Sequence, residues 1–585
     1  MRSFLCCSLP RWILTLGGLA FAAVAVAAYP LGLDNNPDMG PRRIALLALG
    51  LGVTLLAQAG AIRKRLGIAA PSGQTPAVIR EGPPRESSAA PPQPMGLRVW
   101  LPLSLMSLAI IVFYARLVTD GNLADPPATT LYYDMLADAF ASGQTHLKAV
   151  PDPRLADLSN PYNSAELPHI PRCQQGQTSG CLLFDATYYD GKYYLYWGPA
   201  PAALLVPLKL AGIGTVSDSV LAFVGATSLF AFTTAFLVLA WRRFFRSLPA
   251  WLLLPPLLLA GLAYPLPWVL DGPRIYEAAI LHGAAFLMAG LVVAFPILSG
   301  GAAKPARLLV VGLLWGLAFA TRSVLLFPIG AFSAALAWRV WRRPGFSTVA
   351  SGGRLVAMLA IPIGVSAALI AWYNFDRFSN PLEFGWRFVV GALAGQAEGT
   401  LTAFRLDNIP INLFHYAFAP ASLIAEAPFL KPLLARPSIG PVTSPQPDLF
   451  YGELVTGLLY ATPFLLFAAF LLWWLPCRSR TDSAEIKGKA RWEAEGGSDL
   501  RAIIGFIWIG CLAGAIPLLS IYAVTARYLL DLSPMLIVLA GLGAWIAFAG
   551  AATRTSKALI GMAIVGTALA SAVVSILLAF NNWLT

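Results

Sequence analysis

Apolar runs separated by short charged segments dominate the hydropathy pattern of this chain. Many of the runs reach about 20 residues, the length of an α-helix that crosses the hydrocarbon core of a bilayer. Runs of that length exclude a membrane β-barrel, because barrel strands cross with about 9–11 residues. The pattern therefore predicts an all-α polytopic membrane protein with about 13 transmembrane helices.

The predicted spans follow one another along the whole chain. The apolar run 199–213 is not one of them, because about 15 residues are short for a span. A crossing there would also move the basic segment 241–246 to the outside, so the run is predicted to lie along the external interface or to re-enter. The approximate spans are 12–31, 44–62, 98–118, 218–240, 251–270, 277–299, 307–321, 323–339, 354–374, 453–475, 502–523, 527–549 and 558–580.

Composition divides the chain further. Residues 66–95 are rich in Pro, Ser, Ala and Gly, cannot bury enough apolar surface to fold, and are predicted to be a disordered cytoplasmic linker. The predicted parts are a two-span preface over 1–65, the linker 66–95, a membrane core over 96–550 with external loops 119–217 and 375–452, and a C-terminal span within 551–585.

Charge indicates how the chain is oriented. Hydrophobic residues make up 57% of the 585 residues and charged residues 12%, too apolar a balance for a soluble protein of this size. The net charge of +12 does not predict nucleic-acid binding, because the basic residues gather between apolar runs, as Arg242, Arg243 and Arg246 do. This positive-inside pattern predicts a cytoplasmic N-terminus and an external C-terminus.

The loop 119–217 carries nine acidic and five basic residues, a balance that fits a translocated segment. Residues 131–140 have apolar positions at helical spacing and predict an amphipathic helix with Asp134 on its polar face. Cys173 and Cys181 lie close in sequence, and either a small disulfide loop or two free thiols is compatible with this spacing.

Charged side chains collect at the predicted external ends of many spans. Charges near hydrocarbon usually face a cavity, a partner or a ligand, although any single one can be an ordinary solvated loop end. Taken together they predict a binding site in which the substrate-binding residues include Lys192, Arg274, Glu277, Arg322, Arg377, Glu383, Arg527 and Asp531.

These residue types suit chemistry on a phosphate-bearing lipid. Arg322, Arg377 and Arg527 are candidates to hold the phosphate, because Arg binds it through paired N–H donors. An attacking hydroxyl needs a general base or a metal-organising carboxylate, and Asp185 and Asp134 are the candidates. A divalent cation, Mg or Mn, is therefore one option at these two carboxylates.

Tyrosines surround Asp185 in the sequence. Tyr189 and Tyr193 are candidates to stack on a sugar ring, and residues of the aromatic belt at the membrane interface are the alternative. The chain has no phosphate-binding Gly-rich loop, no metal-binding Cys/His spacing and no GxSxG motif.

Several segments together resemble the GT-C superfamily of polyprenyl-phosphate-sugar-dependent glycosyltransferases, and in particular a little-characterised bacterial GT-C-like branch. The resemblance covers roughly residues 98–550, by topology more than by strict motif. It departs at PATTLYY, where many family members place an acidic pair, so Asp134 or Asp185 must supply the acid. The segments are YYDMLADAFASGQTHL (132–147), DATYYDGKYYLYWGPAPAALLVPL (185–208), WGLAFATRS (315–323), WYNFDRFSNPLEFGWRF (372–388) and ARYLLDLSP (526–534).

The resemblance implies a glycosyltransferase of the bacterial cytoplasmic membrane with an external active site. The donor would be a sugar on a polyprenyl phosphate, in bacteria usually undecaprenyl phosphate, and the acceptor a glycan, a lipid or a protein. Two alternatives stay open. A transporter or flippase for a lipid-linked glycan would need polar residues near the midplane of the spans, where most spans lack ionisable groups. A non-catalytic GT-C-like scaffold would explain the missing acidic pair.

Overall fold

The computed structural model describes most of the chain after residue 96. The predictions for spans 12–31 and 44–62 and for the linker 66–95 lie outside the described residues. The chain divides into two compact units, Met1–Ser104 with Leu472–Ile486 and Leu105–Leu471 with Lys487–Thr585, and the second holds every residue of the site. The described residues are 97–122, 130–163, 166–167, 169–173, 177–212, 214–342, 349–390, 403–439, 442–445, 447–477 and 492–580.

Seven helical segments of the described residues are long and apolar enough to cross a membrane. Each coincides with a predicted span, so the prediction of a helical, polytopic membrane protein agrees with them. They are formed by α3 (Leu97–Val118), α7 (Asp218–Ala240) with η2 (Trp241–Phe245), α9 (Ile275–Leu298), η5 (Ser323–Leu325) with α11 (Leu326–Trp341), α12 (Val349–Phe378), α16 (Trp492–Ser520) and α18 (Arg554–Ala579).

Four further predicted spans appear as shorter apolar helices, so the number of about 13 spans is not confirmed. A helix of 17 residues such as α10 is about 26 Å long, against a hydrocarbon core of about 30 Å. Prolines interrupt the other three runs, for example Pro265 after α8. The shorter elements are η3 (Ala250–Leu253), α8 (Leu254–Leu262), η4 (Trp268–Leu270), α10 (Pro305–Thr321), α14 (Leu458–Ala461), η11 (Pro463–Leu465), α15 (Leu466–Cys477), η12 (Ala526–Asp531) and α17 (Ser533–Ala549).

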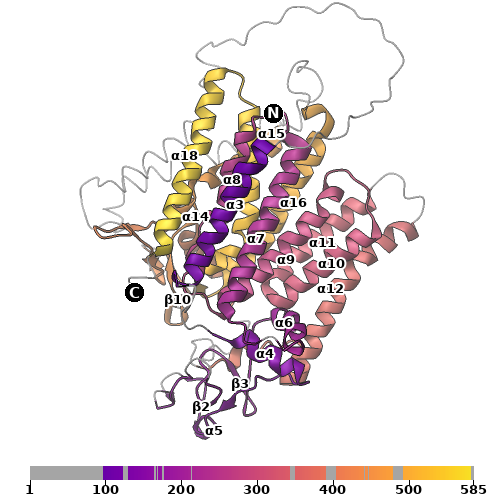
Figure 1. Ribbon diagram of the computed structural model, residues 1–585. Coiled ribbons are helices and arrows are strands. Elements are labelled where there is room, and N and C mark those ends of the chain that lie inside the picture. The colour runs from indigo at the N-terminus through magenta and orange to yellow at the C-terminus, as the bar shows by residue number, and fades with distance from the viewer. Residues whose placement is uncertain are drawn as a thin grey trace, which may run out of the picture. The chain divides into compact units, whose positions relative to one another are not determined.

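Helices α7, α9, α10 and α12 pack in that order, and α11 lies between α12 and α16 (Figure 1). Two glycines let α10 approach α12 closely. A Cβ at Gly312 would lie 2.3 Å from the Leu359 carbonyl oxygen, and one at Gly316 would lie 2.3 Å from Ser366 Oγ. Small residues four positions apart are a common way for membrane helices to pack backbone to backbone. This packing fixes the end of α10, from which Arg322 projects.

The loop region 119–217 folds beside one end of this helix layer. Figure 1 shows α4 and α6 below α7, α9 and α10, and contacts join α4 to α7 and α6 to α10. The hairpin β3–β4 turns at Asp190 and Gly191, which both have positive φ, as a two-residue hairpin turn requires. The elements are α4 (Tyr132–Ala141), β1 (Val150–Pro151), α5 (Arg154–Asp157), β2 (Ser179–Cys181), β3 (Thr187–Tyr189), β4 (Lys192–Tyr194) and α6 (Ala200–Leu210).

Helix α6 has 11 residues and is about 17 Å long, too short to cross a bilayer. Its Leu204 and Leu210 are exposed while Ala202 is fully buried. One apolar face is thus left open, which agrees with the prediction that 199–213 does not span.

The loop region 375–452 consists of short elements. β10 pairs in parallel with β12 (Ala523–Val524), which ties this region to the segment that follows α16. The other pairs are β11 with β7, β5 with β6 and β8 with β9, all antiparallel. The elements of the region are η6 (Trp386–Phe388), η8 (Leu406–Asn408), α13 (Ile409–Leu413), η9 (Phe414–Phe418), β5 (Ser422–Leu423), β6 (Leu430–Lys431), β7 (Leu433–Leu434), β8 (Ser438–Ile439), β9 (Val442–Thr443), η10 (Pro447–Leu449) and β10 (Tyr451–Gly452), and β11 (Leu454–Val455) follows directly after it.

Candidate functional site

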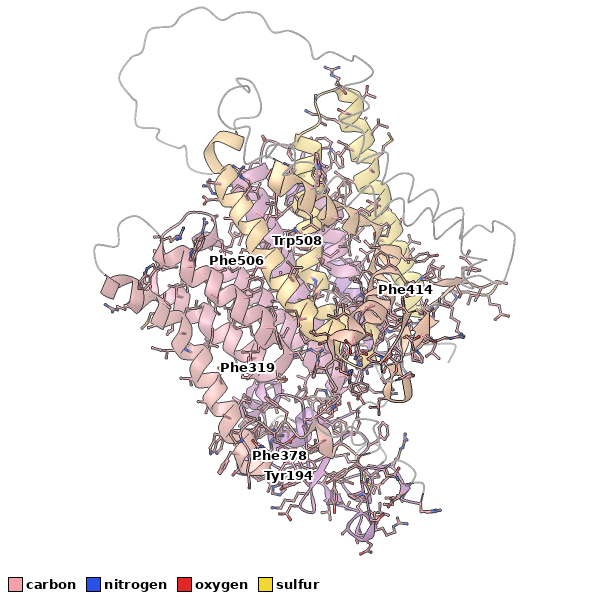
Figure 2. The ribbon with its side chains drawn as sticks, turned by 180° about the vertical axis from the view of Figure 1, so that it is seen from behind. Tyr194, Phe319, Phe378, Phe414, Phe506 and Trp508 are labelled. Carbon is pink, nitrogen blue, oxygen red and sulfur yellow. A yellow bond between two sulfur atoms is a disulfide. The ribbon has the colours of Figure 1, made fainter. Side chains whose placement is uncertain are left out.

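A cavity of about 460 Å³ lies where the two loop regions meet the ends of α9, α10, α12 and α16 and the turn η12. One part of its wall is polar and includes Asp185, Arg274, Glu453 and Arg527. The other part is apolar and reaches between the helices. Its lining residues there include Ile280, Phe319, Leu325, Ile370 and Leu518, and Phe319 is labelled in Figure 2.

Backbone pairing places Asp185 on this wall. Asp185 has a φ of +62°, in the left-handed region that Asp tolerates better than most residues. Its N–H donates to the Val390 carbonyl at 3.1 Å, and the Val390 N–H donates to the Ala186 carbonyl at 2.9 Å. The segment before β3 is therefore held against the segment after η6, and Asp185 is fixed where the two loop regions join.

Asp185 is only 8% exposed, yet no cation forms an ion pair with it among the described residues. The hydroxyl of Tyr276 donates to Oδ2, and the hydroxyl of Tyr196 lies 3.5 Å from the same oxygen. The aromatic rings of Trp197, Tyr196 and Tyr276 pack on one another beside the carboxylate. The cavity thus keeps one buried carboxylate without a neutralising partner.

Burial raises the pKa of Asp185 to about 6, because the aromatic surroundings penalise the charged form. The hydrogen bond from Tyr276 and the charge of Arg527 oppose this effect. A carboxyl group with this pKa is mostly ionised at neutral pH and can still accept a proton readily, which is the property of a general base.

Arg322 follows the last turn of α10 and is tied to Asp531 of η12. Its Nε lies 2.9 Å from both carboxylate oxygens and its Nη2 lies 2.8 Å from Oδ2. Both side chains are mostly buried, and the guanidinium also covers the ring of Tyr528 at 5.1 Å. The structure therefore brings two predicted residues together as a neutral pair on the cavity wall.

Arg527 is paired with Glu453. Its Nη1 and Nη2 donate to the two oxygens of Glu453 at 2.9 and 2.8 Å. Glu277 Oε1 also lies 3.8 Å from Nη1, and the guanidinium lies over the ring of Tyr276 at 4.6 Å from its centroid. Arg527 is thus neutralised before any ligand arrives, as Arg322 is.

Arg377 lines the cavity and has no carboxylate partner among the described residues. Its Nη1 donates to the Leu195 carbonyl, its Nη2 donates to Asn374 Oδ1 at 2.6 Å, and its Nε donates to the Tyr373 carbonyl at 3.3 Å. The bond to Leu195 joins the end of α12 to the segment after β4, and the other two lie within α12. Arg377 therefore has an evident structural role as well as a charge facing the cavity.

Arg274 differs from the other three arginines because its side chain is exposed and has no ion pair among the described residues. Its backbone N–H donates to Glu277 Oε2 at 2.9 Å at the start of α9. The residue lines the cavity, and its guanidinium has no carboxylate partner among the described residues. The sequence placed Arg274 in the predicted site without singling it out for the phosphate.

Asp134 does not join Asp185. It lies in α4, is 5% exposed, and is not among the residues that line the cavity. Lys209 Nζ lies 2.6 Å from its Oδ1, and the Val216 N–H donates to the same oxygen at 2.8 Å. The carboxylate therefore holds α4 against α6, so the polar face of α4 that carries Asp134 is packed against another helix.

This arrangement does not suit a metal ion shared by Asp134 and Asp185, because Asp134 is committed to Lys209. Within the described part of the chain, no three His, Cys, Asp or Glu side chains come together as metal ligands. Glu453 and Asp531, the other carboxylates on the cavity wall, are each paired with an arginine.

Five predicted substrate-binding residues lie off the cavity: Glu277, which lies 3.8 Å from Arg527, and four others. Lys192 is exposed on β4. Tyr189 packs against Phe378 and Phe388, and the buried Tyr193 hydroxyl donates to the Cys181 carbonyl at 3.2 Å. Glu383 is buried and pairs with the half-exposed Arg387, whose Nε lies 2.9 Å from Glu383 Oε2. Figure 2 shows the neighbouring Tyr194 beside Phe378, whose ring centroids are 5.5 Å apart.

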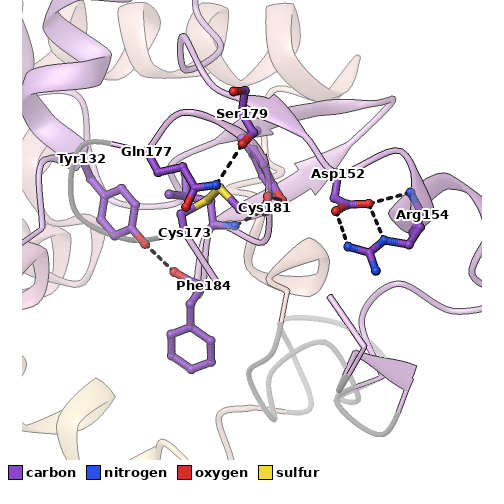
Figure 3. Close-up of a disulfide and its surroundings, with 10 residues drawn as sticks. Tyr132, Asp152, Arg154, Cys173, Gln177, Ser179, Cys181 and Phe184 are labelled. Carbon is purple, nitrogen blue, oxygen red and sulfur yellow. Dashed lines mark hydrogen bonds and ion pairs between the residues drawn. A yellow bond between two sulfur atoms is a disulfide. The ribbon is translucent and has the colours of Figure 1, made fainter. Parts of the chain in front are cut away.

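Cys173 and Cys181 form a disulfide in the loop region 119–217 (Figure 3). Nearby, Arg154 binds Asp152 through two nitrogens, and this hydrogen bonding lowers the pKa of the Asp152 carboxyl to about 2. Tyr132 of α4 donates to the Phe184 carbonyl at 2.5 Å, next to Asp185. The disulfide and the bond from Tyr132 hold the segment just before Asp185, and of these residues only Phe184 lines the cavity.

Two residues of the site were not predicted from the sequence. Glu453 stands at the start of the predicted span 453–475, and an acidic residue at that position could have drawn attention to it. Tyr276 adjoins Glu277, which was predicted, but nothing in the sequence indicates that its hydroxyl meets Asp185.

No family model matches this chain, and no curated protein matches its sequence. Among solved structures the chain is similar to the archaeal oligosaccharyltransferase AglB from Archaeoglobus fulgidus, determined in complex with an inhibitory peptide and a dolichol-phosphate. The match has 14% sequence identity and a TM-score of 0.38, and it covers 83% of this chain and 57% of AglB. The chain thus spans just over half of AglB, and a likeness this remote carries no argument about function.

Proposed function

We propose that this protein is a membrane glycosyltransferase of GT-C type that moves a sugar from a polyprenyl-phosphate donor to an acceptor hydroxyl on the external face of the bacterial cytoplasmic membrane. One observation carries the proposal. A single cavity combines a buried carboxylate that lacks a cation with several arginines and an apolar wall between helices. A ligand that is part phosphate and part hydrocarbon needs both kinds of wall.

In the proposed reaction, Asp185 is the general base. The acceptor oxygen attacks the anomeric carbon of the donor sugar while Asp185 takes the hydroxyl proton. The bond from the anomeric carbon to the phosphate oxygen breaks, and the polyprenyl phosphate leaves with the electron pair. The pKa of about 6 supports this role, since Asp185 is ionised at neutral pH and protonated only transiently.

Arg274 is the proposed anchor for the donor phosphate. Arg322 and Arg527 each already have a bidentate carboxylate partner, so binding a phosphate would require competition with Asp531 or Glu453. Arg274 has no such competitor among the described residues and faces the same cavity as Asp185. In this proposal Arg322 and Arg527 supply shape and local potential, and Arg377 adds an uncompensated positive charge to the wall.

The apolar wall is the proposed site for the first isoprene units of the donor lipid. It is formed by side chains of four helices, including Ile280 of α9, Phe319 of α10, Ile370 of α12 and Leu518 of α16. Burying such a chain contributes about 25 cal/mol per Å² of apolar area, so a few isoprene units add several kcal/mol to donor binding.

The test is sugar transfer by the purified protein in lipid nanodiscs, with a panel of labelled polyprenyl-phosphate sugars and glycan, lipid or protein acceptors. D185N should reduce turnover about 10²–10⁴-fold, the usual contribution of a general base. The matched control is D190N, because Asp190 is exposed at the hairpin turn and Asn also tolerates its positive φ.

Equal turnover of the wild type, D185N and R322A would contradict the proposal that this cavity is the active site. Movement of the lipid-linked glycan across vesicles without any covalent product would identify a flippase instead, and binding of partners without either activity would identify a scaffold.

A further inference from the structure

The two oxygens of Asp185 have different surroundings. Oδ2 receives the hydroxyls of both Tyr276 and Tyr196. Oδ1 has no hydrogen-bond partner within the described part of the chain, although the residue lines the cavity. A carboxylate bound on one oxygen alone cannot rotate freely, so its other oxygen keeps one direction.

Tyr276 is well placed to impose this orientation. It lies in the first turn of α9 and contacts groups from two other parts of the chain. The guanidinium of Arg527 lies over its ring at 4.6 Å, and Trp197 packs against it edge-on at a centroid distance of 5.2 Å. Because Glu453 holds Arg527 in turn, the ring of Tyr276 packs against two groups that are themselves fixed.

We propose that Tyr276 is a positioning residue that binds Oδ2 of Asp185 and so directs Oδ1 toward the acceptor hydroxyl. The direction of Oδ1 toward an acceptor rests on the proposed glycosyltransferase function, whereas the hydrogen bond between Tyr276 and Oδ2 does not. Tyr276 thereby links the base to Arg527, since one side chain contacts both of them.

The hydrogen bond to Oδ2 should also set the acidity of Asp185. The groups that face or influence this carboxyl are Tyr132, Tyr196, Tyr276, Glu453, Tyr522, Arg527 and Tyr528. Burial raises the pKa of Asp185, and the Tyr276 hydroxyl and the Arg527 charge oppose it. Removing the hydroxyl destabilises the carboxylate and should therefore raise the pKa further.

The experiment measures the protonation of Asp185 without relying on activity. A carbodiimide reacts with protonated carboxyl groups, so the fraction of Asp185 labelled at each pH, read by mass spectrometry on the full chain in nanodiscs, gives a midpoint. The midpoint should lie near pH 6 in the wild type. In Y276F it should rise by about one pH unit, the size expected for a hydrogen bond to a charged group.

Three further variants make the result specific. Y196F should move the midpoint in the same direction by less, because the Tyr196 hydroxyl lies 3.5 Å from Oδ2. Y162F is the matched control, since the Tyr162 hydroxyl donates to the Tyr188 carbonyl away from the cavity. If Y276F does not fold, 3-fluorotyrosine at position 276 keeps the shape, donates a stronger hydrogen bond, and should lower the midpoint.

The outcomes separate this inference from the proposed function. A midpoint that is unchanged in Y276F, or unchanged with 3-fluorotyrosine, overturns the positioning role whatever the activity. A shifted midpoint together with a lower kcat, an unchanged KM and an acidic limb of the pH profile shifted upward supports the whole proposal. A shifted midpoint in a protein that transfers no sugar supports the bond between Tyr276 and Asp185 and overturns the part that concerns the acceptor.

Discussion

Two buried aspartates of similar exposure have opposite surroundings in this molecule. Asp134 is 5% exposed and lies 2.6 Å from the ammonium group of Lys209. Asp185 is 8% exposed and has two tyrosine hydroxyls and several aromatic rings around it, with no ion pair among the described residues. Both were predicted to be catalytic, yet only Asp185 lines the cavity.

The difference shows what a buried charge can do. A carboxylate that forms a buried ion pair between two helices holds those helices together, and protonating it would break the ion pair. A carboxylate held by neutral donors remains reactive, because its charged form is stabilised less and a ligand can approach its free oxygen. Local pairing therefore separates a structural from a chemical role, and four kinds of variant test that separation.

Removal of Asp134 should have the largest effect on stability. D134A leaves Lys209 buried, with only Asp138 at 3.5 Å, and should lower the free energy of unfolding by about 3–5 kcal/mol. The half-exposed Asp138 is the matched control, and D138A should cost less than about 1 kcal/mol. Chemical denaturation in detergent measures both, and a D134A protein as stable as D138A would contradict the assignment.

Removal of the Asp185 charge should increase the free energy of unfolding instead. Its folded-state pKa of about 6 exceeds the ordinary value of 3.8, so the carboxyl costs stability above pH 3.8, and the cost becomes complete once the pH passes 6. D185N should therefore be about 3 kcal/mol more stable than the wild type at pH 7–8 and show no advantage below pH 4. Unfolding curves at several pH values test this, and a D185N protein less stable at every pH would refute it.

The arginines of the cavity also differ, because Arg322 and Arg527 are paired with carboxylates and Arg274 is not paired among the described residues. R274A should lower kcat/KM for a polyprenyl-phosphate sugar about tenfold to a hundredfold, mainly through KM, because a charge-assisted hydrogen bond contributes about 1.5–3 kcal/mol. Arg405 is exposed on the second loop region and paired with Asp407, so R405A is the control. If R405A and R274A changed KM equally, Arg274 would not be the phosphate anchor.

The smallest effect is expected at the hairpin β3–β4. Lys192 belongs to the predicted site, but the structure leaves it exposed and off the cavity. K192A should change both stability and turnover by less than about 0.5 kcal/mol, or roughly twofold, as most surface substitutions do. A large loss of transfer in K192A would mean that the hairpin contacts the substrate and that the site is wider than the cavity.

Part of the site follows from sequence because charge near hydrocarbon is costly and therefore informative. Five residues that were predicted on that ground line the cavity: Asp185, Arg274, Arg322, Arg377 and Arg527. The same reasoning could not assign their roles. Whether an arginine meets a carboxylate depends on residues such as Glu453, which stands 74 positions before Arg527 in the chain.

The class of protein follows from local properties of the chain, because the free energy of placing an apolar helix in a bilayer depends on the length and composition of its run. The sequence also indicated the seven long helices, the short helix α4 and the apolar run that is too short to cross. The tertiary structure alone decided which charges neutralise one another. Asp134 pairs with Lys209, and Asp185 accepts a hydrogen bond from Tyr276, because backbone pairing and helix packing bring together segments that are far apart in sequence. No local sequence pattern encodes which of these segments will be in contact.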